Sequence, residues 1–469
     1  MRKTILSILL QSLLSCALWA QVFQVDTLQY NGHPDKYINF VILGDGYTAA
    51  EQGEFIMDAT GLSDYLLSQP PWSNYSNYFN VFAIRVISAQ SGAKHPNTSS
   101  DCSSAFPQVP VSNPDTYLGC SFDSYGIHRL VVANKTVNVV NVLAANFPNY
   151  DQVLIIANSP YYGGAGGTFA TSTADAASPE ITAHEIGHSF AGLADEYYAG
   201  DIYALEKPNM TKQNNPSLVK WKNWLGTGGT GVFQHCCGGN SASWYKPHNN
   251  CKMQALSQPY CPVCREGIIE AIHDLVDPVA AYSPFSSVVS SPEQFLPFRL
   301  TELIKPSPNT LKTEWQLGGA TIARNVDSVL IDQNTLANGA HTLFVSVVDT
   351  GAMLRVDNHA SLHVSLVSWT INKTTSGIRI KDAEDRIICA VYPNPASDLL
   401  HVYIESGTKG RVSFRVLSAD GKTAALATGG LLTNGKYEDK LDVGGLAPGI
   451  YSLIFQVGKV AFSRQFVKQ

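Results

Sequence analysis

The segment His184-Glu-Ile-Gly-His188 constrains this chain more than any other part of the sequence. On an α-helix, side chains four positions apart lie on one face, so His184 and His188 can bind one metal ion together. Glu185 then lies beside that metal, where its carboxylate can take a proton from a bound water. The sequence therefore predicts a helix that carries two metal ligands and a catalytic base.

The residues around this motif indicate where such a helix begins and ends. Ser178 is a favoured N-cap and Pro179 a favoured first helical residue. Gly192 is favoured just past a helix end, because glycine readily adopts the left-handed conformation needed there. We therefore expect a helix that opens at Ser178-Pro179 and stops at Gly192.

A catalytic zinc ion usually takes three protein ligands and leaves a fourth position for water. Gly192 can reverse the chain and bring the residues that follow it back under the metal. Asp195, seven residues after His188, is therefore the first choice for the third ligand. The other choices are Glu196 and, farther along the chain, His235 and His248.

The stretch of residues 163–172 is rich in glycine and directly precedes this helix. An extended peptide can add to an edge strand through main-chain hydrogen bonds, and small residues allow it to come close. Gly166, Gly167 and Thr168 are the predicted substrate-binding residues. A flexible connecting loop is the competing interpretation.

Bulk composition describes a globular, multidomain protein. The 469 residues are 45% hydrophobic and 15% charged, and the net charge is −6. This length suits two to four domains. The mild negative charge gives no electrostatic reason to expect nucleic acid or an anionic membrane as a partner.

The first twenty residues have the pattern of a secretory signal peptide: Arg2 and Lys3, an apolar run over residues 5–14, and then small residues. Cleavage near Ala20 is favoured over the alternative, a lipobox that would leave an acylated Cys16. No later segment is long and apolar enough to be a transmembrane helix.

Export favours disulfides over free thiols. Cys102 and Cys120 are an expected local pair, and the cysteines between Cys236 and Cys264 are expected to form two bridges with one thiol left over. The competing interpretation of that cluster is a structural zinc site with four thiolate ligands, because Cys261-Pro-Val-Cys264 has the spacing of a zinc knuckle.

The pattern along the chain predicts an α/β domain followed by two small all-β sandwich domains. Strands are expected at residues 38–43, 81–87, 129–133 and 153–157, and helices at 49–67 and 136–147. From about residue 280 short strands dominate, for example at 341–348 and 362–371, and Trp315 and Trp369 are expected core residues. The predicted domains are 21–279, 280–385 and 386–469.

Residues 39–272 resemble the bacterial IgA-peptidase family of metzincin-like zinc metallopeptidases. The motifs that carry the resemblance extend from Gly44-Asp-Gly-Tyr-Thr48 through the histidine motif to Cys261-Pro-Val-Cys264. The resemblance implies a mixed-sheet fold and zinc ligands at His184, His188 and Asp195, with Glu185 as general base. It also implies that Met253 forms an apolar floor under the metal.

This chain departs from the commonest metzincin pattern at two positions. The third ligand usually lies six residues after the second histidine, where this chain has Ala194. A tyrosine that steadies the oxyanion in some relatives is replaced by Ala255. The alternatives for that role are Tyr197, Tyr245 and Tyr260.

The C-terminal segment is similar to a type IX secretion sorting domain. The resemblance rests on Tyr392-Pro-Asn-Pro395, Asp420-Gly-Lys422 and the run from Gly445 to Tyr451. It implies export through the periplasm and across the outer membrane by that machinery, to the medium or the cell surface.

Together these features predict a secreted zinc endopeptidase that acts on extracellular proteins. Two alternatives remain: a surface binding module without activity, and a zinc amidase or deacetylase acting on glycan or cell-wall substrates. A structural calcium ion near residues 195–209 is also left open.

Overall fold

The computed structural model describes residues 21–291, 293–373, 387–406, 410–418, 422–432, 435–457 and 460–469. The chain divides into two compact units, residues 1–374 and 375–469. The predicted signal peptide, including Cys16, lies outside the described residues. None of the described helices is long and apolar enough to cross a membrane.

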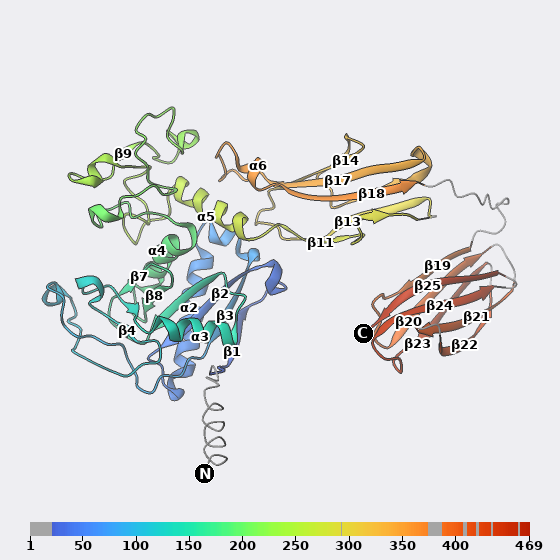
Figure 1. Ribbon diagram of the computed structural model, residues 1–469, viewed down its shortest axis with the longest axis horizontal. Coiled ribbons are helices and arrows are strands. Elements are labelled where there is room, and N and C mark those ends of the chain that lie inside the picture. Colours follow the sequence, from blue (N-terminus) through green and yellow to red (C-terminus); the bar gives the residue numbers. More distant parts are fainter. Residues whose placement is uncertain are drawn as a thin grey trace, which may run out of the picture. The chain divides into compact units, whose positions relative to one another are not determined.

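A six-stranded mixed sheet forms the centre of the first unit (Figure 1). Its strands are β1 (Val25–Gln29), β3 (Phe79–Ile84), β2 (Ile38–Asp45), β6 (Gln152–Ala157), β8 (Ala170–Thr173) and β7 (Gly164–Ala165), in that spatial order. The four central strands are parallel, and β1 and β7 run antiparallel at the two edges. Strands covered on both faces need apolar residues at successive positions, and β2, β3 and β6 are buried throughout.

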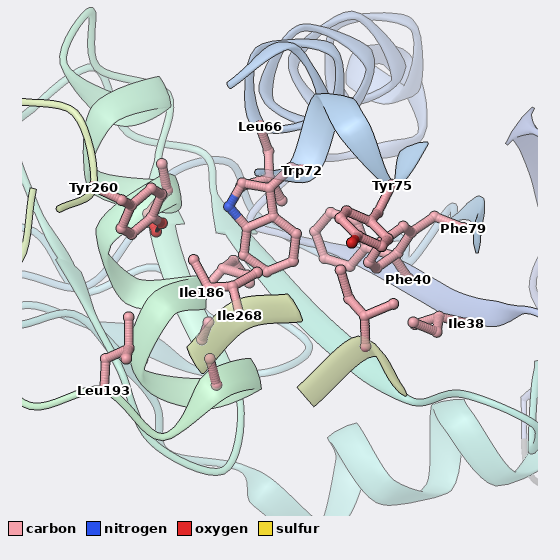
Figure 2. Packing of buried hydrophobic residues seen from close by; sticks show 14 of the residues in the cluster. Ile38, Phe40, Leu66, Trp72, Tyr75, Phe79, Ile186, Leu193, Tyr260 and Ile268 are labelled. Carbon is pink, nitrogen blue, oxygen red and sulfur yellow. Dashed lines mark hydrogen bonds between the residues drawn. The ribbon is translucent and has the colours of Figure 1, made fainter. Parts of the chain in front are cut away.

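Helices cover both faces of this sheet. Phe40 and Ile42 of β2 pack into one core with α2 (Gln52–Ser68), α4 (Ser178–Ala191) and α5 (Pro262–Leu275). Val41 and Leu43 point the other way, into a core with α3 (Thr136–Asn146). Figure 2 shows the first core, in which Trp72 lies among side chains from the sheet and from several helices. The predicted mixed α/β domain is confirmed, whereas its metzincin-like character stays a prediction.

Most of the expected elements of this domain are present, with two corrections. The helices expected at 49–67 and 136–147 and the strands expected at 38–43 and 153–157 are confirmed. The strand expected at 81–87 ends at Ile84. Of residues 129–133, only β5 (Val132–Ala133) is a strand, and it pairs with the short β4 (Cys120–Ser121). Another two-stranded sheet, β9 (Phe233–Gln234) with β10 (Tyr245–Lys246), lies in the long segment between α4 and α5.

A β-sandwich completes the first unit. One sheet contains β11 (Val279–Ser283), β13 (Phe295–Leu303) and β16 (Ser328–Asp332). The other contains β12 (Val288–Val289), β18 (Ser365–Lys373), β17 (Gly339–Asp349), β14 (Leu311–Leu317) and β15 (Ala320–Arg324), with the single-turn α6 (His359–Leu362) before β18. Trp315 and Trp369 stack with ring centroids 5.9 Å apart in its core, as expected.

The second unit is also all-β. One sheet holds β19 (Ile387–Tyr392), β20 (Leu399–Ser406) and β23 (Lys436–Asp442). The other holds β22 (Thr423–Leu431), β21 (Arg411–Ser418), β24 (Gly449–Val457) and β25 (Val460–Lys468). Buried residues from both sheets, among them Val402 and Phe414, form its core.

Candidate functional site

Helix α4 carries the histidine motif at its C-terminal end. The helix begins at Ser178, but its N-cap is Ala177 rather than Ser178, because the Asp175 carboxylate accepts a hydrogen bond from Ala177 N and ends the preceding turn. At the other end Gly192 adopts the left-handed conformation (φ 62°), as expected for a residue that reverses the chain.

His184, His188 and Asp195 come together as the sequence predicts. Asp195 Oδ1 lies 3.0 Å from His184 Nε2 and 3.2 Å from His188 Nε2, and the two Nε2 atoms are 3.1 Å apart. The described part of the chain contains four groups of side chains arranged closely enough to hold a metal ion, and these three residues form one of them. Two imidazoles and a carboxylate suit zinc.

Backbone oxygens fix the orientation of both imidazoles. His184 Nδ1 lies 3.0 Å from Lys252 O, and His188 Nδ1 lies 2.7 Å from Leu193 O. A carbonyl oxygen can only accept, so each Nδ1 carries a proton, and Nε2 is the nitrogen that is left to bind a metal ion. This is the arrangement that metal-binding histidines require.

The loop after Gly192 is held in place mainly by its backbone. Asn209 bonds both the N–H and the carbonyl of Ala194, and Glu196 N donates to Met253 O over 2.7 Å. His235 Nε2 lies 3.1 Å from Asp195 O and 3.0 Å from Tyr197 O. His235 therefore supports the loop and does not face the two histidines, and His248 bonds Gly228 O instead.

Met253 packs against α4, the helix that carries His184 and His188. Its side chain is fully buried, and a Cβ atom placed on Gly187 of α4 would lie 3.0 Å from its sulfur. The neighbouring Lys252 supplies the carbonyl that orients His184, and Met253 supplies the one that holds Glu196. The segment around Met253 therefore supports two parts of the site through its backbone as well as through its side chain.

Glu185 points to the same side of α4 as the predicted ligands. Its side chain is close to Gly166: a Cβ atom on that glycine would lie 2.9 Å from Glu185 Oε2 and 3.2 Å from His188 Cβ. Burial raises the pKa of Glu185 above its ordinary value, although the nearby His184 and His188 act in the opposite direction. A carboxyl with a raised pKa is a better proton acceptor than an exposed one.

The electrostatics of His188 and Asp195 are coupled. Burial alone would lower the pKa of His188, but the hydrogen bond and the charge of Asp195 outweigh it and raise that pKa. Burial alone would raise the pKa of Asp195, but hydrogen bonds with His184 and His188 outweigh it and lower that pKa. The carboxylate therefore stays ionised, which is the form that binds a cation.

A cavity of about 290 Å³ opens beside these residues. Glu185 and His184 line it together with side chains that the sequence did not single out as functional: Arg129, Tyr162 and Lys252. Of the three tyrosines considered for the oxyanion, only Tyr197 lines this cavity, and Arg129 Nη2 lies 3.4 Å from its hydroxyl. Tyr260 instead donates its hydroxyl to Ala183 O, and Asn214 donates to the Tyr245 hydroxyl.

The glycine-rich stretch is a hairpin whose outer strand, β7, is an edge of the main sheet. Gly166, Gly167 and Thr168 lie just beyond β7, in the connection to β8. On the side of β7 that faces away from β8, Gly164 already bonds the backbone of residues 129–131. Its N–H donates to Arg129 O, and its carbonyl accepts from Val131 N. Gly166, the first residue beyond β7, lies next to Glu185.

The expected Cys102–Cys120 disulfide is not formed. Cys102 lies next to His95 and Asp123, whereas Cys120 is buried at the start of β4, and both thiols are free. None of the cysteines between Cys236 and Cys264 is bridged either. The side chain of Cys389 lies outside the part of the structure that is described.

The open question of a calcium ion near residues 195–209 gains no support from these contacts. Asp195 Oδ1 faces the two histidines, and Asn209 Oδ1 accepts a hydrogen bond from Ala194 N. These two oxygens are therefore already engaged, and a calcium ion near residues 195–209 stays a prediction.

Solved structures resemble the chain only weakly. Latent PorU from Porphyromonas gingivalis shares 15% identity over 40% of this chain and 20% of that one, with a TM-score of 0.19. The β-glucuronidase of Faecalibacterium prausnitzii shares 14% identity over 34% of this chain and 33% of that one, with a TM-score of 0.15. The fibronectin(III)-like modules of Clostridium thermocellum CbhA share 12% identity over 40% of this chain and 94% of that one, with a TM-score of 0.16. These scores are too low to carry an argument about fold or function.

Family models give the informative matches, whereas no curated protein matches the chain. The C-terminal match covers residues 390–469 and is to the secretion system C-terminal sorting domain, which indicates export by type IX secretion to the cell surface or the medium. The other match covers residues 27–232, which include the whole histidine motif and Asp195. The resemblances to the IgA-peptidase family and to a type IX secretion sorting domain are thereby confirmed, and residues 27–232 match the model of the IgA Peptidase M64 family.

Proposed function

We propose that this protein is a secreted zinc endopeptidase that cleaves extracellular proteins, with His184, His188 and Asp195 as the zinc ligands. The observation that carries the proposal is the convergence of three ligand atoms within 3.2 Å of one another, with both Nδ1 atoms fixed on backbone carbonyls. A bound zinc ion would polarise the scissile carbonyl and make water a nucleophile near neutral pH.

Glu185 is the proposed general base and acid. Its carboxylate, buried beside the ligands, takes a proton from the attacking water and then gives it to the leaving nitrogen of the peptide. The raised pKa of this carboxyl favours both steps, because the group must accept and then release a proton at working pH. Tyr197 and Arg129 line the same cavity and are the proposed donors to the developing oxyanion.

The substrate is proposed to bind as an extended strand along the edge that begins at Gly166. Gly166 is the first residue beyond β7, and an extended backbone there would turn its N–H and carbonyl to the same side as those of Gly164. At Gly164 that side is filled by residues 129–131, whereas Gly166 makes no such backbone bond to these residues in the described structure. A peptide that pairs there passes beside Glu185, where a side chain on residue 166 would obstruct it.

The test is the variant Glu185→Gln, which keeps the shape of the side chain but cannot accept the proton. We expect it to bind as much zinc as the wild type and to cleave an unfolded protein substrate about 10²–10⁴-fold more slowly. Glu206→Gln, on an exposed glutamate, is the matched control and is expected to cleave normally. Equal cleavage by the Glu185→Gln variant and the wild type would refute the proposed role.

A further inference from the structure

A second group of side chains lies directly behind the candidate active site. It consists of Glu196, Cys251, Cys261 and Cys264, whose ligand atoms all lie within 4.8 Å of one another. All four residues are buried, and Glu196, Cys251 and Cys264 are fully so. They come from three separate parts of the chain: the loop after Asp195, the segment before Met253, and the start of α5.

Three of the six separations between these atoms fit a tetrahedral metal site. Four ligands at about 2.3 Å from a central zinc ion lie about 3.8 Å from one another, whereas disulfide sulfurs are about 2.05 Å apart. Cys251 Sγ and Cys264 Sγ are 3.6 Å apart. Glu196 Oε1 lies 3.2 Å from Cys264 Sγ and 3.9 Å from Cys261 Sγ.

The start of α5 and one backbone N–H lie beside the thiols. Cys261 is the N-cap of α5 and Cys264 lies in its first turn, where the helix dipole stabilises negative charge. Cys261 N also donates to Cys251 Sγ over 3.2 Å. Deprotonated thiols are the form that binds zinc.

Glu196 provides an independent sign that a cation belongs here. Its Oε1 atom accepts a hydrogen bond from Asn209 Nδ2 over 3.1 Å, whereas its Oε2 atom is buried and has no hydrogen-bond partner in the described structure. The nearby Lys246 donates its ammonium to the backbone oxygen of Glu196 and not to the carboxylate. A buried carboxylate without a cation is costly, and a divalent metal would compensate it.

We propose that Glu196, Cys251, Cys261 and Cys264 bind a structural zinc ion. Four protein ligands leave no position for water, so the site is closed and has no catalytic role of its own. Its effect is on the neighbouring site: Glu196 directly follows Asp195, and Cys251 directly precedes Lys252, whose carbonyl orients His184. The ion would therefore help to fix the positions of Asp195, the proposed third ligand of the catalytic zinc, and of His184.

Metal content and thiol chemistry test this site without reference to cleavage. We expect the full chain to hold one more equivalent of zinc than the variant Cys264→Ser. Cys120→Ala, which changes an equally buried cysteine outside the group, is the control and should lose none. An unchanged zinc content in a folded Cys264→Ser variant would overturn the proposal.

Two measurements on unsubstituted protein apply even if that variant does not fold. After denaturation in chelator without reductant, alkylation and peptide mapping should find Cys251, Cys261 and Cys264 all as free thiols. With cobalt in place of zinc, the protein should show the near-ultraviolet charge-transfer absorption of several thiolates on one ion. A disulfide between any two of the three cysteines, or cobalt binding without that absorption, would contradict the site.

A different group supports a second, independent proposal. His95, Cys102, Asp123 and His128 also converge closely enough to hold a metal. Asp123 Oδ1 lies 2.9 Å from His128 Nδ1, 3.2 Å from Cys102 Sγ and 3.6 Å from His95 Nε2. Backbone groups hold two of these side chains. His95 Nδ1 bonds Pro110 O, which orients the imidazole, and Thr98 N donates to Asp123 Oδ2, which holds the carboxylate.

We infer that these four side chains form another structural zinc site. His128, whose Nε2 is buried without a partner in the described structure, directly precedes Arg129 in the wall of the active-site cavity. The variant Cys102→Ala is expected to lose one equivalent of zinc, whereas His33→Gln, on an exposed histidine, should lose none. Full zinc content in a folded Cys102→Ala variant, or a Cys102–Cys120 disulfide in peptide mapping of the wild type, would overturn this inference.

Discussion

Asp349 joins the peptidase domain to the β-sandwich through one buried carboxylate. Its Oδ2 accepts a hydrogen bond from the Tyr75 hydroxyl over 2.5 Å and lies 3.2 Å from Nε2 of His273, which belongs to α5. Its Oδ1 accepts from Thr310 Oγ1 and Gly351 N in the sandwich. Replacing Asp349 with Asn keeps the shape but removes the charge on which these contacts depend.

The pKa of Asp349 gives the size of the effect. Burial alone would raise this pKa, but the hydrogen bonds from His273, Thr310 and Tyr75 outweigh it and lower the pKa from 3.8 to about 2. At about 1.36 kcal/mol per pH unit, this difference corresponds to roughly 2 kcal/mol in favour of the folded state. We therefore expect Asp349→Asn to lower the free energy of unfolding of the first unit by about 2 kcal/mol.

Urea denaturation followed by tryptophan fluorescence measures this change. Asp327→Asn is the control, because Asp327 forms an exposed ion pair with Lys305 and should contribute less than about 1 kcal/mol. Since the folded-state pKa is the lower one, the stabilisation is complete above pH 3.8 and is lost as the pH falls toward about 2. A loss below about 0.5 kcal/mol at about pH 7, or a difference between variant and wild type that grows on acidification, would show that the charge of Asp349 does not stabilise the first unit.

Three further predictions concern the active site. Gly166→Ala places a Cβ atom 2.9 Å from Glu185 Oε2 and should slow cleavage on the order of 10–100-fold with zinc content unchanged, whereas Gly61→Ala, in open space, should cleave normally. Tyr197→Phe removes a proposed oxyanion donor, so kcat should fall on the order of 100-fold with little change in KM; an unchanged kcat would remove Tyr197 from the mechanism. His235→Gln loosens the loop that carries Asp195 and should weaken zinc binding about tenfold in a chelator competition, while His248→Gln should leave it unchanged.

The histidine motif and its neighbours could be predicted because they depend on local geometry. A four-residue spacing on a helix brings His184 and His188 together, and a glycine at position 192 turns the chain, whatever the rest of the fold does. The same holds for the long apolar strands β2 and β6, which need cover on both faces. Helix α4 starts one residue earlier than the capping pattern predicts, because Asp175, not Ser178, completes the turn before it.

The parts that sequence reasoning missed depend on contacts between distant segments. Arg129 reaches the cavity only because residues 129–131 bond Gly164, which lies far along the chain. The sequence predicts that the cysteines pair with one another, but their neighbours include a glutamate, two histidines and an aspartate. No spacing rule connects Glu196 with Cys251, or His95 with Asp123, so only the folded chain shows these groups.

A crystal structure with anomalous diffraction measured at the zinc absorption edge would show whether His184, His188 and Asp195 hold a zinc ion. The proposal predicts a zinc ion about 2.0–2.2 Å from His184 Nε2, His188 Nε2 and a carboxylate oxygen of Asp195, with Glu185 nearby but not bound to it. A site without zinc in protein purified with zinc present, or a zinc ion held by the two histidines with Asp195 turned away, would contradict it.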